Sequence, residues 1–140
     1  MSTFTVKTGR IGLDISKPHF YILSKGMNSG KPLNLPCPNC FVFITETEED
    51  KEFYYWLIFG LWNSKAFHQF LRGSVIPFII IGELKKCIET GAEEAKANLS
   101  KFLEAVKVLK FLDLKEKQFK QNLQLISEAK RAIFYRYKRK

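Results

Sequence analysis

The chain has 140 residues, of which 46% are hydrophobic and 14% aromatic, and it carries a formal net charge of +9 at pH 7. This length and composition predict a single folded body with a substantial core and exclude a largely disordered chain. No apolar run approaches the roughly 18–20 residues that a membrane span needs, and the first 15 residues lack the apolar segment of a signal peptide. With only three cysteines, the chain fits a reducing compartment. We therefore expect a cytoplasmic protein without a membrane partner.

The charge is concentrated at one end. Residues 96–140 hold 13 of the 23 Lys and Arg residues but only four of the 14 acidic ones. Such an asymmetry indicates a polyanionic partner, most simply double-stranded DNA. The alternative is a solvated Lys-rich helical face that keeps the protein soluble.

Three short strands are predicted in the first 45 residues. Residues 3–8 alternate apolar and polar side chains, and residues 20–23 and 41–45 are short apolar runs. Residues 24–32, SKGMNSGKP, read as a loop because they are rich in Gly, Ser, Asn and Lys. Basic, polar loops beside strands often contact phosphates or base edges, although an ordinary surface turn has the same composition. The candidate DNA contacts in this loop are Lys25, Asn28 and Lys31.

A CxxC pair lies in PCPNC, residues 36–40. Structural zinc sites need four ligands, and Cys87, His19 and His68 have no paired spacing that would complete one. We interpret the segment as a proline-stiffened turn leading into a strand, with zinc as the minor alternative. The sequence thus predicts no metal and no cofactor.

An aromatic helix is predicted over residues 53–70. Apolar side chains recur there at three- and four-residue steps, which gives one wide apolar face. Thr47, followed three residues later by Asp50, resembles a helix N-cap arrangement. A break at residues 63–65 would divide the helix into two.

A turn and an apolar run follow this helix. Arg72-Gly73-Ser74 precedes Val75 to Ile81, whose β-branched residues predict a buried strand, confined by Pro77 to an edge or to the strand start. In the turn, Arg72 and Ser74 are candidate DNA contacts.

From Ala92 onward the pattern becomes helical. An apolar seam at three- and four-residue steps predicts coiled-coil-like packing, either on the domain itself or on a second subunit. Asp113 and Glu116 have the spacing of a second helix start, so the region is either a helical hairpin or one long helix. The candidate dimer interface comprises Leu99, Phe102, Val106, Leu109, Phe119, Leu123, Ile126 and Ile133. In the basic, aromatic end that follows, the candidate phosphate contacts are Lys130, Arg131, Arg136 and Arg139.

Together these elements predict an α+β fold. A small, twisted mixed sheet with the aromatic helix packed on it would occupy residues 1–91. Residues 92–140 would form the helical region.

The segments FYYWLIFGLWNSKAFHQFLRGSVIPFIIIGELKK and SKFLEAVKVLKFLDLKEKQFKQNLQLISEAKRAIF resemble the specificity subunits of type I restriction-modification systems. In that family, a target-recognition domain is followed by a connecting helix that packs as a coiled coil. FYILSKGMNSGKP is similar to a loop between strands of the recognition domain. The resemblance covers about residues 20–138 and implies a truncated, half-subunit-like protein that reads DNA. Two features depart from the family pattern, a short N-terminal part and Gly91-Ala92-Glu93-Glu94 at the helix start.

The sequence-based hypothesis is a non-catalytic DNA-binding protein that forms a homodimer through its C-terminal helices. The alternative is a protein-interaction module of a restriction-modification system or mobile element that binds no DNA itself. An enzyme is not expected, because the chain contains no paired-carboxylate motif, Walker loop, HExxH or nucleophile elbow.

Overall fold

The computed structural model describes residues 3–139, which fold into a four-stranded sheet and three α-helices. In chain order the strands are β1 (Phe4–Thr8), β2 (His19–Leu23), β3 (Pro32–Leu33) and β4 (Cys40–Thr45). They are ordered β1-β4-β2-β3 across the sheet, and every pair is antiparallel. The prediction of a mixed sheet is therefore wrong, because the sheet is entirely antiparallel. Parallel neighbours would need a long crossover connection, usually a helix, and no helix lies between these strands in the chain. The α+β class is confirmed.

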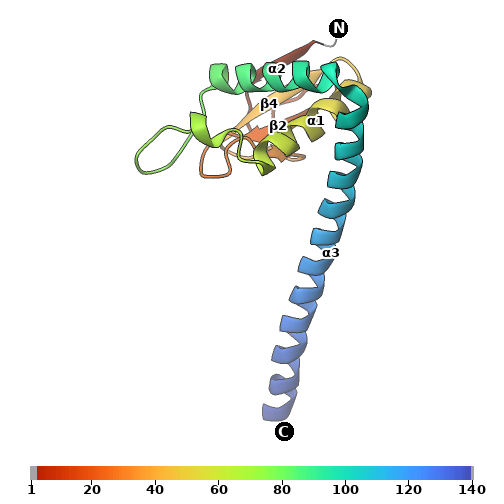
Figure 1. Cartoon of the computed structure of the whole chain (residues 1–140). Helices are drawn as coiled ribbons and strands as arrows, with labels where there is room; N and C mark the ends of the chain where they lie inside the picture. The colour runs from red at the N-terminus through yellow and green to blue at the C-terminus, as the bar shows by residue number, and fades with distance from the viewer. Residues whose placement is uncertain (1–2, 140) are drawn as a thin grey trace. The chain divides into compact units, whose positions relative to one another are not determined.

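The described chain also contains three α-helices and a short 3-10 turn (Figure 1). They are α1 (Glu48–Asn63), a 3-10 turn (His68–Phe70), α2 (Ile81–Ala97) and α3 (Leu99–Lys138). Side chains alternate across the sheet, so that Phe20 and Phe43 face the helices while Tyr21 and Val42 face the other side. The main core lies between the first of these faces and the apolar sides of α1 and α2.

Helix α1 begins as its capping sequence predicts. The Asp50 backbone N–H donates to Thr47 Oγ1 at 3.1 Å, which satisfies one of the amides left free at a helix start. The helix nevertheless starts five residues earlier than expected and ends at Asn63, where the anticipated break occurs. Lys65 adopts a positive φ of 65°, and the short 3-10 turn follows it.

The prediction of a strand from Val75 to Ile81 is wrong. These residues form an irregular loop that ends where α2 begins, at Ile81. Arg72 and Phe78 exchange two backbone hydrogen bonds of 2.9 Å, which closes the loop at its base. Pro77 offers no N–H for a ladder, and Val75 remains 89% exposed at the tip.

The expected domain boundary between residues 91 and 92 falls inside α2. Gly91 and Ala92 are both buried, and Leu84, Ile88 and Ala92 belong to the same core. The chain divides into two compact units at a later point, the first ending at Phe102 and the second beginning at Leu103.

Of the two predicted forms of the C-terminal region, the structure contains the single long helix. Asp113 and Glu116 do not start a second helix, because both lie within α3 and pair with lysines one turn later. The Asp113–Lys117 and Glu116–Lys120 distances are 3.1 and 3.3 Å. Among the residues described, no helix combines the length and the apolar character needed to cross a membrane.

Candidate nucleic-acid interface

Two loops that carry predicted contacts are hydrogen-bonded to each other in the first unit. The Gly26 N–H donates to the Pro77 carbonyl at 2.7 Å, and the Ile79 N–H donates to the Ser24 carbonyl at 3.2 Å. Lys25 and Arg72 both form isolated β-bridges with Phe78. The structure thus brings Lys25 and Asn28 into the same region as Arg72 and Ser74, although about 50 residues separate them in sequence.

The loop between β2 and β3 is held in one conformation from inside. The Ser29 hydroxyl is fully buried and donates to the Gly26 carbonyl at 2.6 Å. Gly30 has a φ of 99° and lies against the Phe67 ring. These constraints leave Lys25 and Asn28 on the exposed side of the loop.

The exposed residues among the five predicted loop contacts include Lys25, Asn28 and Ser74. The other two, Arg72 and Lys31, already have side-chain contacts. Arg72 donates from its guanidinium to Glu83 Oε1 at 2.5 Å, and this hydrogen bond raises the pKa of Arg72. Lys31 places its ammonium 5.2 Å from the centre of the Trp62 ring, a cation–π contact. Glu83 therefore neutralises part of the positive charge that Arg72 would offer to a phosphate.

The predicted phosphate contacts at the C-terminus belong to the second unit. Lys130, Arg131 and Arg136 lie on α3 and are exposed, as is Arg139 directly after it. Glu128 is the last acidic residue of the chain, and Gln124 Nε2 already donates to its carboxylate at 3.3 Å. Every charged side chain after Glu128 is a cation.

The predicted dimer-interface residues divide into two groups. Phe102 packs on the core of the first unit, with its ring 5.2 Å from that of Phe53. Val106 is buried, Leu109 is half-buried and Leu99 is about half exposed. The remaining four are exposed by 53% to 70% of their surface: Phe119, Leu123, Ile126 and Ile133.

Comparison of the sequence with known protein families assigns the chain to a family. A family model described as a family of unknown function (DUF6943) matches residues 6–136.

The chain belongs to DUF6943.

No curated protein and no solved structure matches this DUF6943 chain. Its fold and its surfaces are therefore the source of functional evidence.

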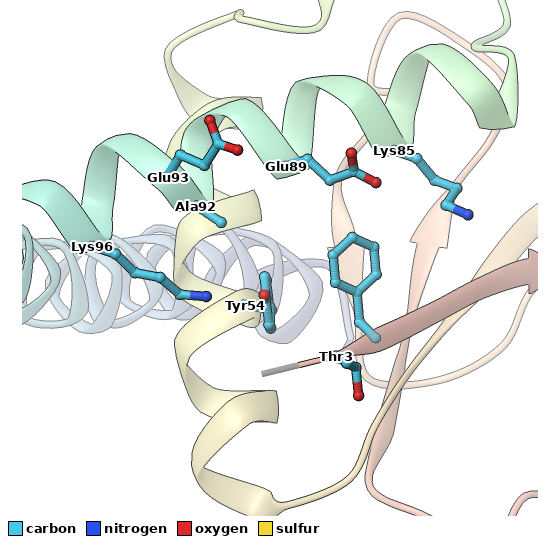
Figure 2. Close-up of a pocket in the computed structure, with 8 residues that line it drawn as sticks. Thr3, Tyr54, Lys85, Glu89, Ala92, Glu93 and Lys96 are labelled. Carbon is cyan, nitrogen blue, oxygen red and sulfur yellow. The ribbon is translucent and has the colours of Figure 1, made fainter. Parts of the chain in front are cut away.

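Sequence reasoning missed a pocket of about 460 Å³ in the first unit of this DUF6943 protein. Phe4, Tyr54 and Ala92 supply its apolar surface, and two Lys and two Glu residues line it on the α2 side (Figure 2). These four lie at spacings that put them on one side of the helix: Lys85, Glu89, Glu93 and Lys96. The i, i+4 spacing could have indicated that they share a face, but α2 was not predicted to extend over Lys85 and Glu89. Its balanced charges give the pocket no preference for a polyanion.

The cysteines of the DUF6943 chain are free thiols. The Cys40 thiol is buried at the start of β4 and donates to the Cys37 carbonyl at 3.1 Å, as expected for a turn. Burial raises the pKa of Cys40 and of Cys87, so both are neutral thiols and weak nucleophiles near pH 7. Within residues 3–139, no group of three or more His, Cys, Asp or Glu side chains could hold a metal ion.

Proposed function

We propose that the protein is a non-catalytic DNA-binding protein that forms a homodimer through α3 and needs no cofactor. The observation that carries the proposal is the C-terminal end of α3, where exposed cations occur without an acidic residue. Neutralising phosphates with such side chains releases condensed counterions, which provides binding energy that does not depend on base sequence.

The loops of the first unit supply a second, smaller group of contacts in this proposal. Lys25 and Asn28 are exposed on a constrained loop, and Ser74 is exposed in the adjoining loop. Because Arg72 is paired with Glu83, we assign it a weaker role than the sequence suggested. Lys31 likewise remains a secondary candidate, since it contacts Trp62.

The resemblance to type I specificity subunits also favours DNA as the polyanion. In this proposal the protein corresponds to half of such a subunit and works with a restriction-modification partner. The segment from Val75 to Ile81 is a loop in this protein and not the strand that the resemblance implies. The parts of the resemblance that support the proposal are therefore the β2–β3 loop and the helices. A cytoplasmic location is part of the same proposal and is supported by the three free thiols.

An electrophoretic shift with random duplex DNA at several salt concentrations tests the proposal. We expect binding that weakens steeply with salt, and replacing Arg131, Arg136 and Arg139 together by Gln should lower the log–log salt slope by about one unit per lost phosphate contact. A variant with Lys7, Arg10 and Lys86 replaced by Gln is the matched control, because it removes three exposed cations from the first unit. No shift at low salt, or equal weakening of both variants, contradicts the proposal.

A second candidate function is a protein-interaction module without DNA binding. The exposed apolar side chains of α3 favour it, because a helix with that much uncovered apolar surface normally has a protein partner. Light-scattering mass, measured on the same samples, distinguishes the two. Self-association in the absence of any DNA shift would favour the module.

A further inference from the structure

Helix α3 carries a stripe of mostly apolar side chains along one face, here called the seam. Two of its positions are charged. From Leu109 onward, seam positions recur at alternating three- and four-residue steps, the spacing that coiled-coil helices use. They are Leu109, Leu112, Glu116, Phe119, Leu123, Ile126, Lys130, Ile133 and Tyr137. At about 1.5 Å per residue, this seam is roughly 42 Å long.

The apolar side chains of this seam are largely uncovered. From Leu112 to Tyr137 each of them is more than half exposed, and Ile133 reaches 70%. The seam therefore needs a partner with the same length, an apolar stripe, and charges opposite to Glu116 and Lys130. A second copy of α3 supplies all three.

We propose that α3 pairs with a second copy of itself in the antiparallel direction. This inference rests on the dimer of the proposed function and adds its direction and register. The choice between the two directions follows from the charges at and beside the seam.

A parallel, in-register pair would create three kinds of like-charge contact. Glu116 would face Glu116 of the second copy, and Lys130 would face Lys130. Lys115 and Lys120 flank the seam five residues apart, the spacing at which side chains of parallel helices meet across the pair. Each of these contacts is repulsive.

An antiparallel pair with Leu123 opposite Ile126 of the second copy removes all three of these contacts. Glu116 then faces Ile133, and Phe119 faces Lys130. Glu116 and Lys130 of the second copy occupy consecutive layers, about 5 Å apart along the axis, within reach of their long side chains. Two-fold symmetry produces this pair twice. The arrangement introduces one new kind of like-charge contact, between Lys115 and Arg136, which also occurs twice.

The present contact of Glu116 does not prevent this pairing. Glu116 and Lys120 are 3.3 Å apart, with side chains 65% and 72% exposed. Exposed pairs of this kind contribute little stability, so Glu116 can exchange Lys120 for Lys130 of the second copy. Lys130 then pairs with Glu116 across the dimer, while Arg131, Arg136 and Arg139 remain available to bind phosphates.

Charge exchange between the two seam positions tests the direction. The variants Glu116→Lys and Lys130→Glu should each weaken the dimer, roughly 5- to 30-fold in the dissociation constant measured by sedimentation equilibrium. The double variant should restore it to within about twofold of the unchanged protein, because opposite charges again meet. In a parallel pair, the double variant would still place like charges together.

The control exchanges the same charges away from the seam. Lys107→Glu and Glu128→Lys lie on the opposite side of α3 and are exposed, so they should leave the dissociation constant nearly unchanged. A dimer whose double seam variant is no tighter than the single variants overturns the antiparallel arrangement but leaves the dimer intact. A protein that is monomeric at all concentrations overturns both.

Discussion

Gly30 shows how one residue can determine a loop. Its φ of 99° is a conformation that other residues rarely adopt, and a Cβ placed there would lie 2.2 Å from the nearest Phe67 ring atom. Gly26, in the same loop, has a similar φ of 93° but has no atom within 4 Å of such a Cβ. Substituting each glycine in turn therefore distinguishes the effect of backbone strain, which both positions share, from that of steric overlap, which only Gly30 has.

We expect Gly30→Ala to lower the free energy of unfolding by about 2–4 kcal/mol, since it adds an overpacked contact in the core to the backbone strain. Gly26→Ala should cost only about 1 kcal/mol, the strain alone. Urea unfolding followed by circular dichroism measures both. Equal losses for the two variants would show that the Phe67 contact contributes nothing.

At the scale of elements, the loop before α2 is the main difference between the predicted and observed folds. Its β-branched residues are typical of a strand, but Leu84, Ile88 and Ala95 on α2 already follow a helical spacing from Ile81 onward. The long helical pattern therefore determines the structure of residues 81–97. The residues before it are closed into a loop by the Arg72–Phe78 hydrogen bonds, which link backbone groups that side-chain patterns do not describe.

The exposure of this loop predicts unequal effects along it. Replacing Val75 and Ile76 together by Ser should change the free energy of unfolding by no more than about 0.5 kcal/mol, because both side chains are in solvent. Ile79→Ser is the matched control and should cost about 3 kcal/mol or more, since Ile79 is buried in the core. Thermal or urea unfolding would measure both. A large loss from the Val75 and Ile76 change would mean that the tip packs on the protein after all.

Helix α3 illustrates an ambiguity of a different kind. The Asp113 and Glu116 spacing is compatible both with a helix start and with pairs to Lys117 and Lys120 inside a helix. No Gly or Pro interrupts residues 99–138, which favours the continuous helix. Local spacing alone could not decide between a hairpin and one helix.

For the whole molecule, the sequence predicted the fold class, three of the four strands and the capped start of α1. It also identified the cation-rich end of the chain, whose predicted contacts Lys130, Arg131, Arg136 and Arg139 are exposed. It could not predict that the Lys25 loop and the Arg72 loop adjoin, because that depends on hydrogen bonds between distant segments. The partners of Arg72 and Lys31, Glu83 and Trp62, were missed for the same reason.

A dimer through α3 would make the stability of the whole protein depend on its concentration. Raising the concentration roughly 50-fold should add about 2 kcal/mol of apparent stability per dimer and raise the melting temperature, because association favours the folded state by mass action. Differential scanning calorimetry at two concentrations measures this shift. The variant with Leu123 and Ile126 replaced by Asp should melt at the same temperature at both, and so should the unchanged protein if α3 does not pair.

The first turn of α3 belongs to the first unit, and this has a consequence for how the helix forms. Phe102 donates its N–H to the Asn98 carbonyl at 3.1 Å and packs its ring on Phe53. Starting a helix is the costly step, whereas each added residue costs little or nothing. The folded first unit thus supplies a nucleus from which the remaining turns extend. Residues 103–139 on their own would lack that nucleus, so their helical structure would depend on finding a partner helix.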